Sequence, residues 1–354
     1  MTPPLPERNA PGRDRALLRV VATSDLHLAL RGHDYTSDRP TPGLGLATLA
    51  PLIARLRAEA PGSLLLDNGD LLQGGPMGSL WATGALAAPH PALAALETLG
   101  YDALGLGNHE FDHGLGPLER ALAAARPPVL AGNLAGLGPG VRPWLLLNRD
   151  LPGIAGRGRS VTVGVTSFLP PGLLDANADH LRDRITAAPV LDSARAILPR
   201  MRAAGAEVIV VLCHAGFAGD REAGPETVAG DLARLPGVDA LIAGHSHRPF
   251  PLPGGDAPPG ADPAQGHVNG TPAVLPPPFG AGLGVIDLWL SPRPGGGWQS
   301  AGGTGRIVLP DPADRAAPAV LRATARAHAC TRAHGASALG ETRAALHSHF
   351  ALLG

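Results

Sequence analysis

Short, continuous apolar runs recur along the chain, separated by clusters of small and polar residues. They lie at residues 17–22, 63–66, 103–106, 129–131, 160–165, 208–212 and 239–243. Runs this short and this uniformly apolar are typical of strands buried on both faces. Ala- and Leu-rich stretches that predict helices alternate with them, at 45–60, 90–99, 117–125, 190–204 and 226–235. Alternation of this kind predicts a layered α/β domain.

The pattern becomes less regular beyond residue 250. Residues 251–267 are rich in Pro and Gly and predict a mobile loop. Strand-like segments follow at 273–275, 283–290 and 306–309, with a Gly-rich turn at 295–297. The stretch 311–334 predicts one exposed helix, and residues 1–15 predict a disordered tail.

Polar clusters of metal-binding type follow five of the apolar runs, each at the end of the run. They contain Asp25 and His27, Asp70, Asn108 with His109, His214, and His245 with His247. Groups just past the carboxyl ends of strands in an α/β sheet meet in one crevice, so we expect these side chains to lie together. Carboxylates, imidazoles and a carboxamide, with no thiolate, suit divalent ions such as Mn²⁺, Mg²⁺, Fe²⁺ or Zn²⁺.

The spacings within the clusters agree with that interpretation. Asp25 and His27 are alternate residues leaving a strand, so both side chains can point the same way. His109 and Asp112 are three residues apart at a predicted helix start, where the carboxylate could orient the imidazole and hold it protonated. Gly69, Gly107 and Gly244 are expected to let the backbone turn sharply at the metals without a clashing Cβ.

Each piece also has a plainer explanation. Asp70 could cap a helix, Asn108 could stabilise a turn, and His214 could be a core histidine. We expect structural roles for the neighbouring polar residues as well, namely Asp67, Asn68, Glu110, His113, Asn133 and Cys213. The recurrence of ligand-type residues at one position in five strands favours the metal site.

Composition narrows the class of protein further. Charged residues make up 17% of the chain, aromatic residues 3%, and the formal net charge is −1, which argues against a nucleic-acid surface. Cys213 and Cys330 are too few for a disulfide framework or a thiolate zinc site. Neither a signal-peptide core nor a run of roughly 18 apolar residues is present, so no membrane association is expected. As written, the chain is expected to be cytoplasmic; a start codon further upstream would make it periplasmic.

Taken in order, the motifs DLH, GD, GNHE, a lone strand-end His and GHSH resemble the signature of the calcineurin-like metallophosphoesterases. The longer segments TSDLHL, LLLDNGDLLQG, LGLGNHEFDHG, GVDALIAGHSH and VNGTPAVLPPPFGAGLGVIDL resemble the bacterial 2′,3′-cyclic-nucleotide 2′-phosphodiesterase/3′-nucleotidases. The resemblance implies a layered α-β-β-α sandwich with the metal site at the carboxyl ends of the strands. It also implies two-metal hydrolysis of phosphate esters, with a small nucleotide as the substrate.

The resemblance assigns a role to each candidate residue. One metal ion would be held by Asp25, His27 and His247, the other by Asn108, His214 and His245, and Asp70 would bridge them. His109 would lie next to the phosphate with Asp112 as its partner. The two divalent ions could be Mn, Zn, Fe, Co or Mg. Residues 16–310 would form the catalytic domain, and residues 311–354 a linker helix and the start of a C-terminal domain.

The chain also departs from the cyclic-nucleotide branch. That branch often has Asn where this chain has Asp112, which is nearer to the 5′-nucleotidase pattern. The stretch 276–282, PPPFGAG, has another residue in place of a Gly of that branch and lacks the polar pair expected before Leu283 and Gly284. The relatives' C-terminal, substrate-binding domain is expected to be absent here. A 5′-nucleotidase-like phosphomonoesterase, or a truncated metal-binding remnant with little turnover, are therefore the alternative functions. A phosphoesterase acting on proteins or nucleic-acid ends is a third possibility.

Overall fold

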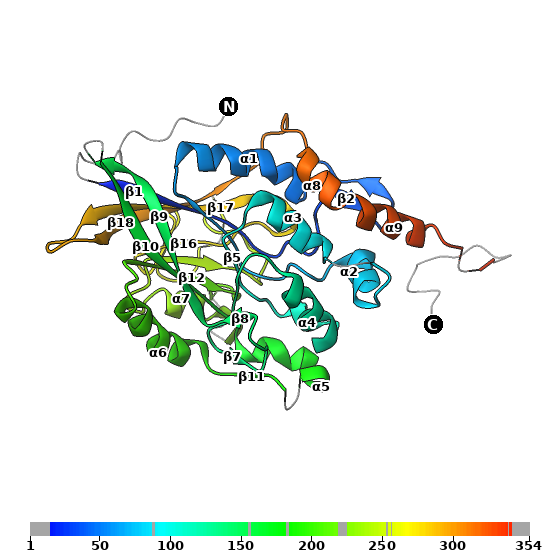
Figure 1. The fold of residues 1–354 in the computed structure, drawn as a ribbon, viewed down its shortest axis with the longest axis horizontal. Helices are drawn as coiled ribbons and strands as arrows, with labels where there is room; N and C mark the ends of the chain where they lie inside the picture. Colours follow the sequence, from blue (N-terminus) through cyan, green and yellow to red (C-terminus); the bar gives the residue numbers. More distant parts are fainter. Residues whose placement is uncertain are drawn as a thin grey trace.

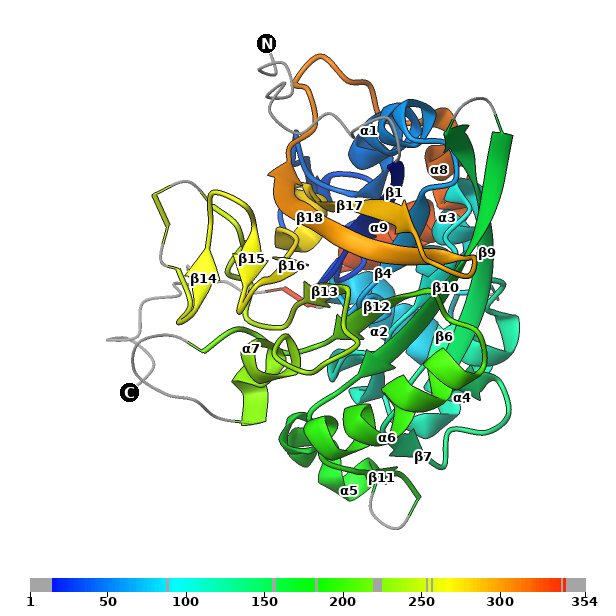
Figure 2. The ribbon, with the colours of Figure 1, turned by 90° about the vertical axis from the view of Figure 1, so that its left-hand side faces the viewer.

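The computed structural model describes residues 15–86, 89–154, 157–181, 184–218, 225–252, 254–255, 257–338 and 340–341. All but Arg15 of the tail expected over 1–15 lies outside these residues, as does most of the chain after 338. Two seven-stranded β-sheets lie face to face at the centre, and helices cover both outer faces (Figures 1 and 2). The structure confirms the predicted α-β-β-α sandwich.

The first sheet has the strand order β18-β17-β1-β4-β5-β6-β8. Strands β1, β4, β5, β6 and β8 run parallel, while β17 and β18 are antiparallel additions at one edge. The bounds are β1 Ala16–Thr23, β4 Leu64–Asp67, β5 Ala103–Leu104, β6 Val129–Leu130, β8 Val141–Arg142, β17 Leu283–Pro292 and β18 Trp298–Val308.

The second sheet has the order β14-β15-β16-β13-β12-β10-β9. Its centre is parallel, and β9 pairs antiparallel with β10 at the edge. The bounds are β9 Trp144–Ile154, β10 Arg157–Phe168, β12 Val208–Cys213, β13 Ala240–Ala243, β14 Ala261–Asp262, β15 His267–Val268 and β16 Thr271–Val274. Two small ribbons join β2 His33–Asp34 to β3 Arg39–Pro40, and β7 Leu134–Ala135 to β11 Thr186–Ala187.

Helices close the outer faces of both sheets (Figure 1). Over the first sheet lie α1 Leu46–Glu59, α2 Gly75–Ala82, α3 Pro91–Leu99, α4 Leu115–Ala124, α8 Pro318–Ala323 and α9 Ala325–Gly335; α6 Val190–Ala203 and α7 Ala229–Leu232 cover the second, and α5 is Ala178–Leu181. Short 3₁₀ turns are His109–Phe111, Pro171–Asn177, Pro225–Thr227 and Pro278–Gly280. Among the described residues, no helix is both long and apolar enough to cross a membrane.

The continuous apolar runs follow from this layering. In β1, the side chain of Val20 packs between the two sheets while that of Val21 packs beneath the helices. Both side chains lie in an apolar layer, so the strand is buried on both faces. The layer between the sheets is filled by aliphatic residues and Trp298.

Several predicted elements need correction. The helix expected over 226–235 is only a 3₁₀ turn and the four-residue α7. The helix expected over 311–334 begins at Pro318, is divided at Thr324, and is not wholly exposed, because Val320, Thr324 and Thr331 are buried. The loop expected over 251–267 contains β14 and reaches β15.

Candidate metal centre

The structure brings all seven predicted ligands to one edge of the sandwich. Asp25, His27, Asp70 and Asn108 follow β1, β4 and β5 of the first sheet, and His214, His245 and His247 follow β12 and β13 of the second. Parallel strands in both sheets end at this edge, which is why residues far apart in sequence meet there.

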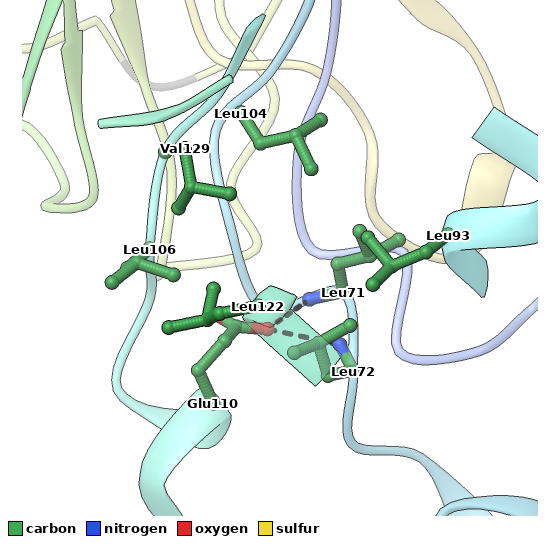
Figure 3. A pocket seen from close by; sticks show the side chains of 9 residues that line it. Leu71, Leu72, Leu93, Leu104, Leu106, Glu110, Leu122 and Val129 are labelled. Atoms are coloured by element: carbon green, nitrogen blue, oxygen red, sulfur yellow. Dashed lines mark hydrogen bonds between the residues drawn. The ribbon is translucent and has the colours of Figure 1, made fainter. Parts of the chain in front are cut away.

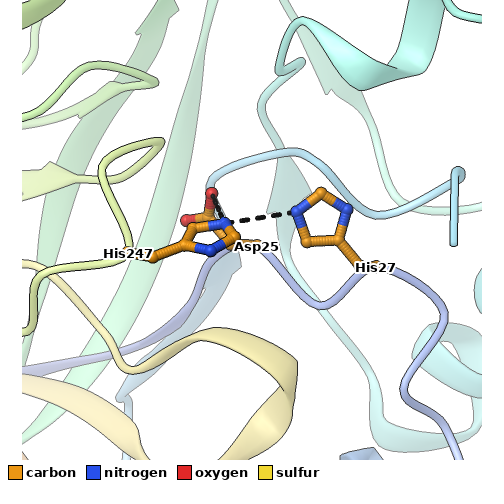
Figure 4. A group of neighbouring side chains, drawn as sticks. All are labelled: Asp25, His27 and His247. Carbon is orange, nitrogen blue, oxygen red and sulfur yellow. Dashed lines mark hydrogen bonds and ion pairs between the residues drawn. The ribbon is translucent and has the colours of Figure 1, made fainter. Parts of the chain in front are cut away.

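A first ligand group consists of Asp25, His27 and His247, whose donor atoms all lie within 4.8 Å of one another. His247 Nε2 is 3.3 Å from Asp25 Oδ1 and 3.3 Å from His27 Nε2 (Figure 4). Asp25 is buried, whereas His247 is on the exposed side. The group therefore combines a buried carboxylate with an imidazole that faces solvent.

A second group consists of Asp70, His214 and His245, again with donors within 4.8 Å. His214 Nε2 is 3.0 Å from Asp70 Oδ2, and Asn108 Oδ1 is 3.1 Å from His245 Nδ1. The same oxygen of Asp70 is 3.7 Å from His27 Nε2 of the first group. Asp70 thus lies between the groups, in the place where the sequence predicts a bridging carboxylate.

The hydrogen bonds of two histidines fit metal binding. His214 Nδ1 is 2.8 Å from the carbonyl oxygen of Asn68, and His27 Nδ1 is 3.2 Å from that of Gln73. A carbonyl only accepts, so each Nδ1 carries the proton and Nε2 is left for a cation. His214 Nε2 is buried and makes no hydrogen bond of ordinary geometry. An orphaned, buried nitrogen beside a carboxylate is well suited to a divalent ion.

The pKa values show how the charges of Asp25, Asp70 and His214 affect one another. Burial by itself would raise the pKa of Asp70 and Asp25, but the neighbouring His214 lowers both below their ordinary value. Burial would lower the pKa of His214, yet Asp70 and Asp25 raise it to about 10. One positive charge therefore has to accompany the two buried carboxylates, and a bound cation can replace the proton on His214.

The backbone of the ligand loops is unusual. Asp25, His27, Asp70, His245 and His247 have φ values of 54°, 44°, 54°, 67° and 54°. Positive φ is uncommon outside glycine, and such strain persists mainly at functional sites. It was not predicted, because nothing in the residue types signals it.

The three glycines next to the ligands serve two different purposes. Gly69 has φ +91°, as a sharp turn requires. Gly107 and Gly244 do not have positive φ. They are needed for close packing instead, because a Cβ at Gly107 would lie 2.1 Å from Asp70 Oδ1 and one at Gly244 would lie 2.4 Å from Ser24 Oγ.

His109 and Asp112 form the predicted pair at the rim of the site. His109 Nδ1 is 2.6 Å from Asp112 Oδ2, and the backbone N–H of His109 donates to Asp70 Oδ1 at 2.9 Å. Burial lowers the pKa of His109, but the hydrogen bond to Asp112 and the charge of Asp70 outweigh it and raise that pKa. The ring lies 5.2 Å from that of His27, centroid to centroid.

Sequence reasoning missed Asn177. Its side-chain amide donates to Asp112 Oδ1 at 3.1 Å and so fixes the carboxylate that holds His109. Asn177 is 65 residues from Asp112, in the 3₁₀ turn after β10, and no motif marks it.

Glu110 organises the loops from inside the protein. Its carboxylate accepts the backbone N–H groups of Asp70, Leu71, Leu72 and Gly107 at 2.6–2.9 Å. Figure 3 shows the carboxylate bonded to the backbone of Leu71 and Leu72 beside a small cavity of about 10 Å³ lined mostly by leucines. Glu110 therefore joins the loop after β4 to the loop after β5, and it does not lie in either ligand group.

The other polar neighbours make structural contacts. The amide of Asn133 bonds to the backbone of Leu169 and Ala188, and Asp67 accepts from Thr23 at 2.7 Å. Cys213 is a buried free thiol, and Cys330 is free as well.

Comparisons with known proteins give concordant results. The calcineurin-like phosphoesterase family model matches residues 18–249. The chain is 36% identical over 288 residues to the 2′,3′-cyclic-nucleotide 2′-phosphodiesterase/3′-nucleotidase of Yersinia enterocolitica, covering 80% of this chain and 44% of that protein. It is 37% identical to the Salmonella typhimurium protein of the same name, again over 80% of this chain and 44% of the relative. The chain thus spans less than half the length of these curated relatives.

A solved structure matches over its whole length. The calcineurin-like phosphoesterase YfkN from Bacillus subtilis superimposes with a TM-score of 0.84 at 31% identity, covering 91% of this chain and 100% of that one.

Proposed function

The chain belongs to the calcineurin-like phosphoesterase family, and from that premise we propose that it hydrolyses phosphate esters of small nucleotides with two divalent metal ions. The observation that carries the proposal is the position of Asp70. One of its carboxylate oxygens lies 3.0 Å from His214 Nε2 and 3.7 Å from His27 Nε2, between two groups of metal-binding side chains.

Each ion has a set of ligands in this proposal. Asp25, His27 and His247 hold one, Asn108, His214 and His245 hold the other, and Asp70 bridges them. Oxygen and nitrogen donors suit Mn, Zn, Fe, Co or Mg. When bound, a pair of such ions supplies positive charge to the phosphoryl oxygens and a water that ionises near neutral pH.

His109 supplies the proton in this proposal. Asp112 accepts the Nδ1–H of His109, which leaves Nε2 of the same ring for the substrate. Burial lowers the pKa of His109, but the hydrogen bond to Asp112 raises it, so Asp112 favours the protonated form of the ring. A protonated imidazole at the rim can donate to the ester oxygen as it leaves. Asn177 and Asp112 hold the ring in place for that transfer.

The relatives' names suggest the substrate. Both curated proteins are named 2′,3′-cyclic-nucleotide 2′-phosphodiesterase/3′-nucleotidase, and we propose the same substrate class here. Asp112 favours a second candidate function, a 5′-nucleotidase-like phosphomonoesterase, because a carboxylate at this position resembles the 5′-nucleotidase sequence pattern. A metal-binding remnant with little turnover remains the third alternative, and the complete set of seven donors argues against it.

Metal content and turnover, measured together, test the proposal. After reconstitution with Mn²⁺ or Zn²⁺, we expect about two ions per chain by elemental analysis, and chelator-sensitive hydrolysis of bis-p-nitrophenyl phosphate. Asp70→Ala should lose metal and activity together, because this residue belongs to both sites. Asp192→Ala is the matched control, since Asp192 is 71% exposed on α6, and it should change neither.

Three outcomes would separate the alternatives. Trace metal after reconstitution would contradict the proposal. Two bound ions without turnover would support the remnant. Phosphate release from 5′-AMP but no hydrolysis of 2′,3′-cyclic AMP would support the 5′-nucleotidase-like alternative.

A further inference from the structure

Phe279 is an exposed aromatic residue at the edge of the metal centre. Its ring centroid lies 5.5 Å from that of His27 and 5.4 Å from that of His247, both members of the first ligand group. The residue is 41% exposed. Only 3% of the chain is aromatic, so an exposed Phe beside two metal-binding imidazoles needs an explanation.

The loop that carries Phe279 is fixed to the site. The backbone N–H of Phe279 donates to the carbonyl oxygen of Asp25 at 2.9 Å, and its own carbonyl accepts from Gly45 at 3.0 Å. The next residue, Gly280, packs so closely that a Cβ there would lie 2.9 Å from the backbone of Gly45. The backbone of Phe279 is therefore tied to that of Asp25, a member of the first group.

The backbone of Phe279 is also strained. Its φ is 57°, in the left-handed region that bulky side chains seldom adopt. Glycine would relieve that strain, yet the position carries a large aromatic ring. Strained residues that persist at a site are commonly part of its function.

The residues around Phe279 indicate which part of a bound substrate it would contact. The ring of His27 is a neighbour of both Phe279 and His109, at centroid distances of 5.5 and 5.2 Å. Asp25, Asp70 and His214 are buried beneath, so an ester group bound at the metals must point outward past Phe279, His109 and His247. The first ring that follows the phosphate in a nucleotide is the ribose; the base lies one ring further out.

We propose that Phe279 is a specificity-determining residue that packs against the ribose of the ester substituent. The inference rests on the proposed function and deepens it, because it identifies the part of the nucleotide that this chain recognises. Apolar contact with the carbon face of a sugar ring does not depend on the base. Phe279 should therefore favour esters that carry a sugar over the same phosphate without one, whichever base is attached.

Ligand binding tests the inference without requiring turnover. The probes are nonhydrolysable 3′-phosphonate analogues of adenosine and cytidine, with methylphosphonate as the matched probe that lacks sugar and base. Dissociation constants would be measured by calorimetry on the metal-loaded full chain. The variants are Phe279→Leu and Phe279→Ala, which retain a side chain at positive φ and so leave the strain comparable. Leu252→Ala, at a 47% exposed apolar residue of another loop, is the control.

The expected result is selective. Phe279→Ala should weaken both nucleoside phosphonates about tenfold and Phe279→Leu about threefold, while methylphosphonate binding and metal content stay within twofold of wild type. Leu252→Ala should change none of them. An equal loss for methylphosphonate would place the effect at the metals and overturn the inference. A wild type that binds nucleoside phosphonates no better than methylphosphonate would also overturn it, as would a fivefold or larger difference between the adenosine and cytidine effects.

Failure of the proposed function is distinguishable from failure of the inference. The wild-type chain could bind metal and prefer the nucleoside phosphonates through Phe279, yet hydrolyse neither cyclic nor open nucleotides. That result would support the Phe279 contact and contradict the proposed hydrolase activity.

Discussion

At the scale of single residues, the arrangement around His109 carries most of the proposed chemistry. Asn177 donates a hydrogen bond to Asp112, and Asp112 accepts a hydrogen bond from His109 Nδ1–H. The backbone N–H of His109 is bound to Asp70, so the imidazole is tied to the centre through its main chain, and Nε2 is free to face a substrate. Removing the ring should therefore affect proton transfer without removing a metal ligand.

We expect His109→Ala to lower kcat for 2′,3′-cyclic AMP, whose leaving group is a sugar hydroxyl, by roughly 10²–10⁴, the range for lost acid–base assistance. Metal content, measured by elemental analysis, should stay at the wild-type level. Asp112→Asn should lower kcat less, because the ring remains while its orientation and raised pKa are weakened. Metal loss in His109→Ala would show that His109 is a ligand and that its assigned role is wrong.

The sequence located the candidate residues better than it described their surroundings. Asp25, Asp70 and His214 could be identified because each ends an apolar run, and strand ends meet at one edge of a sheet. The backbone environment could not be identified in this way. Glu110 accepts four N–H groups only because two loops fold around it, and its residue type and spacing do not reveal that.

At the scale of elements, the buried strands were predicted well and the edges poorly. Strand β9 was missed because Asn148, Arg149 and Asp150 interrupt its apolar pattern, as an edge strand partly open to solvent allows. The start of β18 was missed because glycines usually oppose strand formation. Here they permit close packing, since a Cβ at Gly305 would lie 2.5 Å from the carbonyl oxygen of Ala273.

The C-terminal helices are attached to the segment between β1 and α1 rather than exposed along their length. Arg31 donates to Thr324 at 2.9 Å, Tyr35 bonds to His328 at 2.9 Å, and Arg332 pairs with Asp38 at 2.7 Å. These partners lie between β1 and α1, almost 300 residues away in sequence. Sequence periodicity cannot reveal such contacts, which is why a single exposed helix was expected.

The start of α3 depends on a neutral histidine. His90 is buried; its Nδ1 accepts the N–H of Ala92 at 3.3 Å, and its Nε2 contacts the carbonyl of Leu72 at 3.1 Å. Nδ1 must therefore be unprotonated and Nε2 must carry the proton. Burial lowers the pKa of His90 from 6.5 to about 3. Protonation would place a hydrogen on Nδ1 against the N–H of Ala92.

This gives a pH-dependent stability with a defined sign. The unfolded chain binds a proton at His90 near pH 6.5 and the folded chain only near 3. The contribution of neutral His90 to the free energy of unfolding is complete above pH 6.5. It is lost as the pH falls toward 3, by at most about 1.4 kcal/mol per pH unit. His90→Asn retains a cap for α3 but does not titrate. Its unfolding free energy should be lower at pH 8 and should fall less steeply between pH 6.5 and 4.

Urea denaturation of the metal-free protein across that range measures both curves. His334→Asn is the matched control, because His334 is exposed on α9, and its curve should run parallel to wild type. If the unfolding free energy of His90→Asn also changed with pH in parallel with that of wild type, His90 would not be the source of the pH dependence.

At the scale of the whole molecule, the candidate metal centre lies where the two sheets meet. Asp25 and His27 come from the first sheet and His247 from the second, and the other group is divided in the same way, with Asp70 and Asn108 on one side and His214 and His245 on the other. A cation in either group would therefore add a cross-link between the sheets, beside the apolar layer and hydrogen bonds such as that of His214 Nδ1 to the carbonyl oxygen of Asn68.

Metal binding should stabilise the fold against unfolding. A site at 100 times its Kd in free metal contributes about 2.7 kcal/mol, so we expect chelation to lower Tm by several degrees in differential scanning calorimetry. His247→Ala should reduce the metal-dependent increase in Tm, because one cross-link loses its ligand from the second sheet. Asp192→Ala, on the surface of α6, should retain the full increase. An equal Tm with and without metal would contradict the prediction that bound metal stabilises the fold by joining the two sheets.

The last prediction concerns recognition of the base. Among the residues that the structure describes, Phe279 is the only Phe, Tyr or Trp whose ring contacts a ligand imidazole. Aromatic stacking contributes about 1–3 kcal/mol per base, and the site offers no second ring near the ligands within the described part of the chain. We therefore expect kcat/KM values for 2′,3′-cyclic AMP, CMP, GMP and UMP to agree within about tenfold, with weak binding expressed mainly in KM. Phe279→Ala should lower all four alike, because the sugar contact is common to them. A preference of a hundredfold or more for one base would mean that this chain has a base-specific pocket of its own.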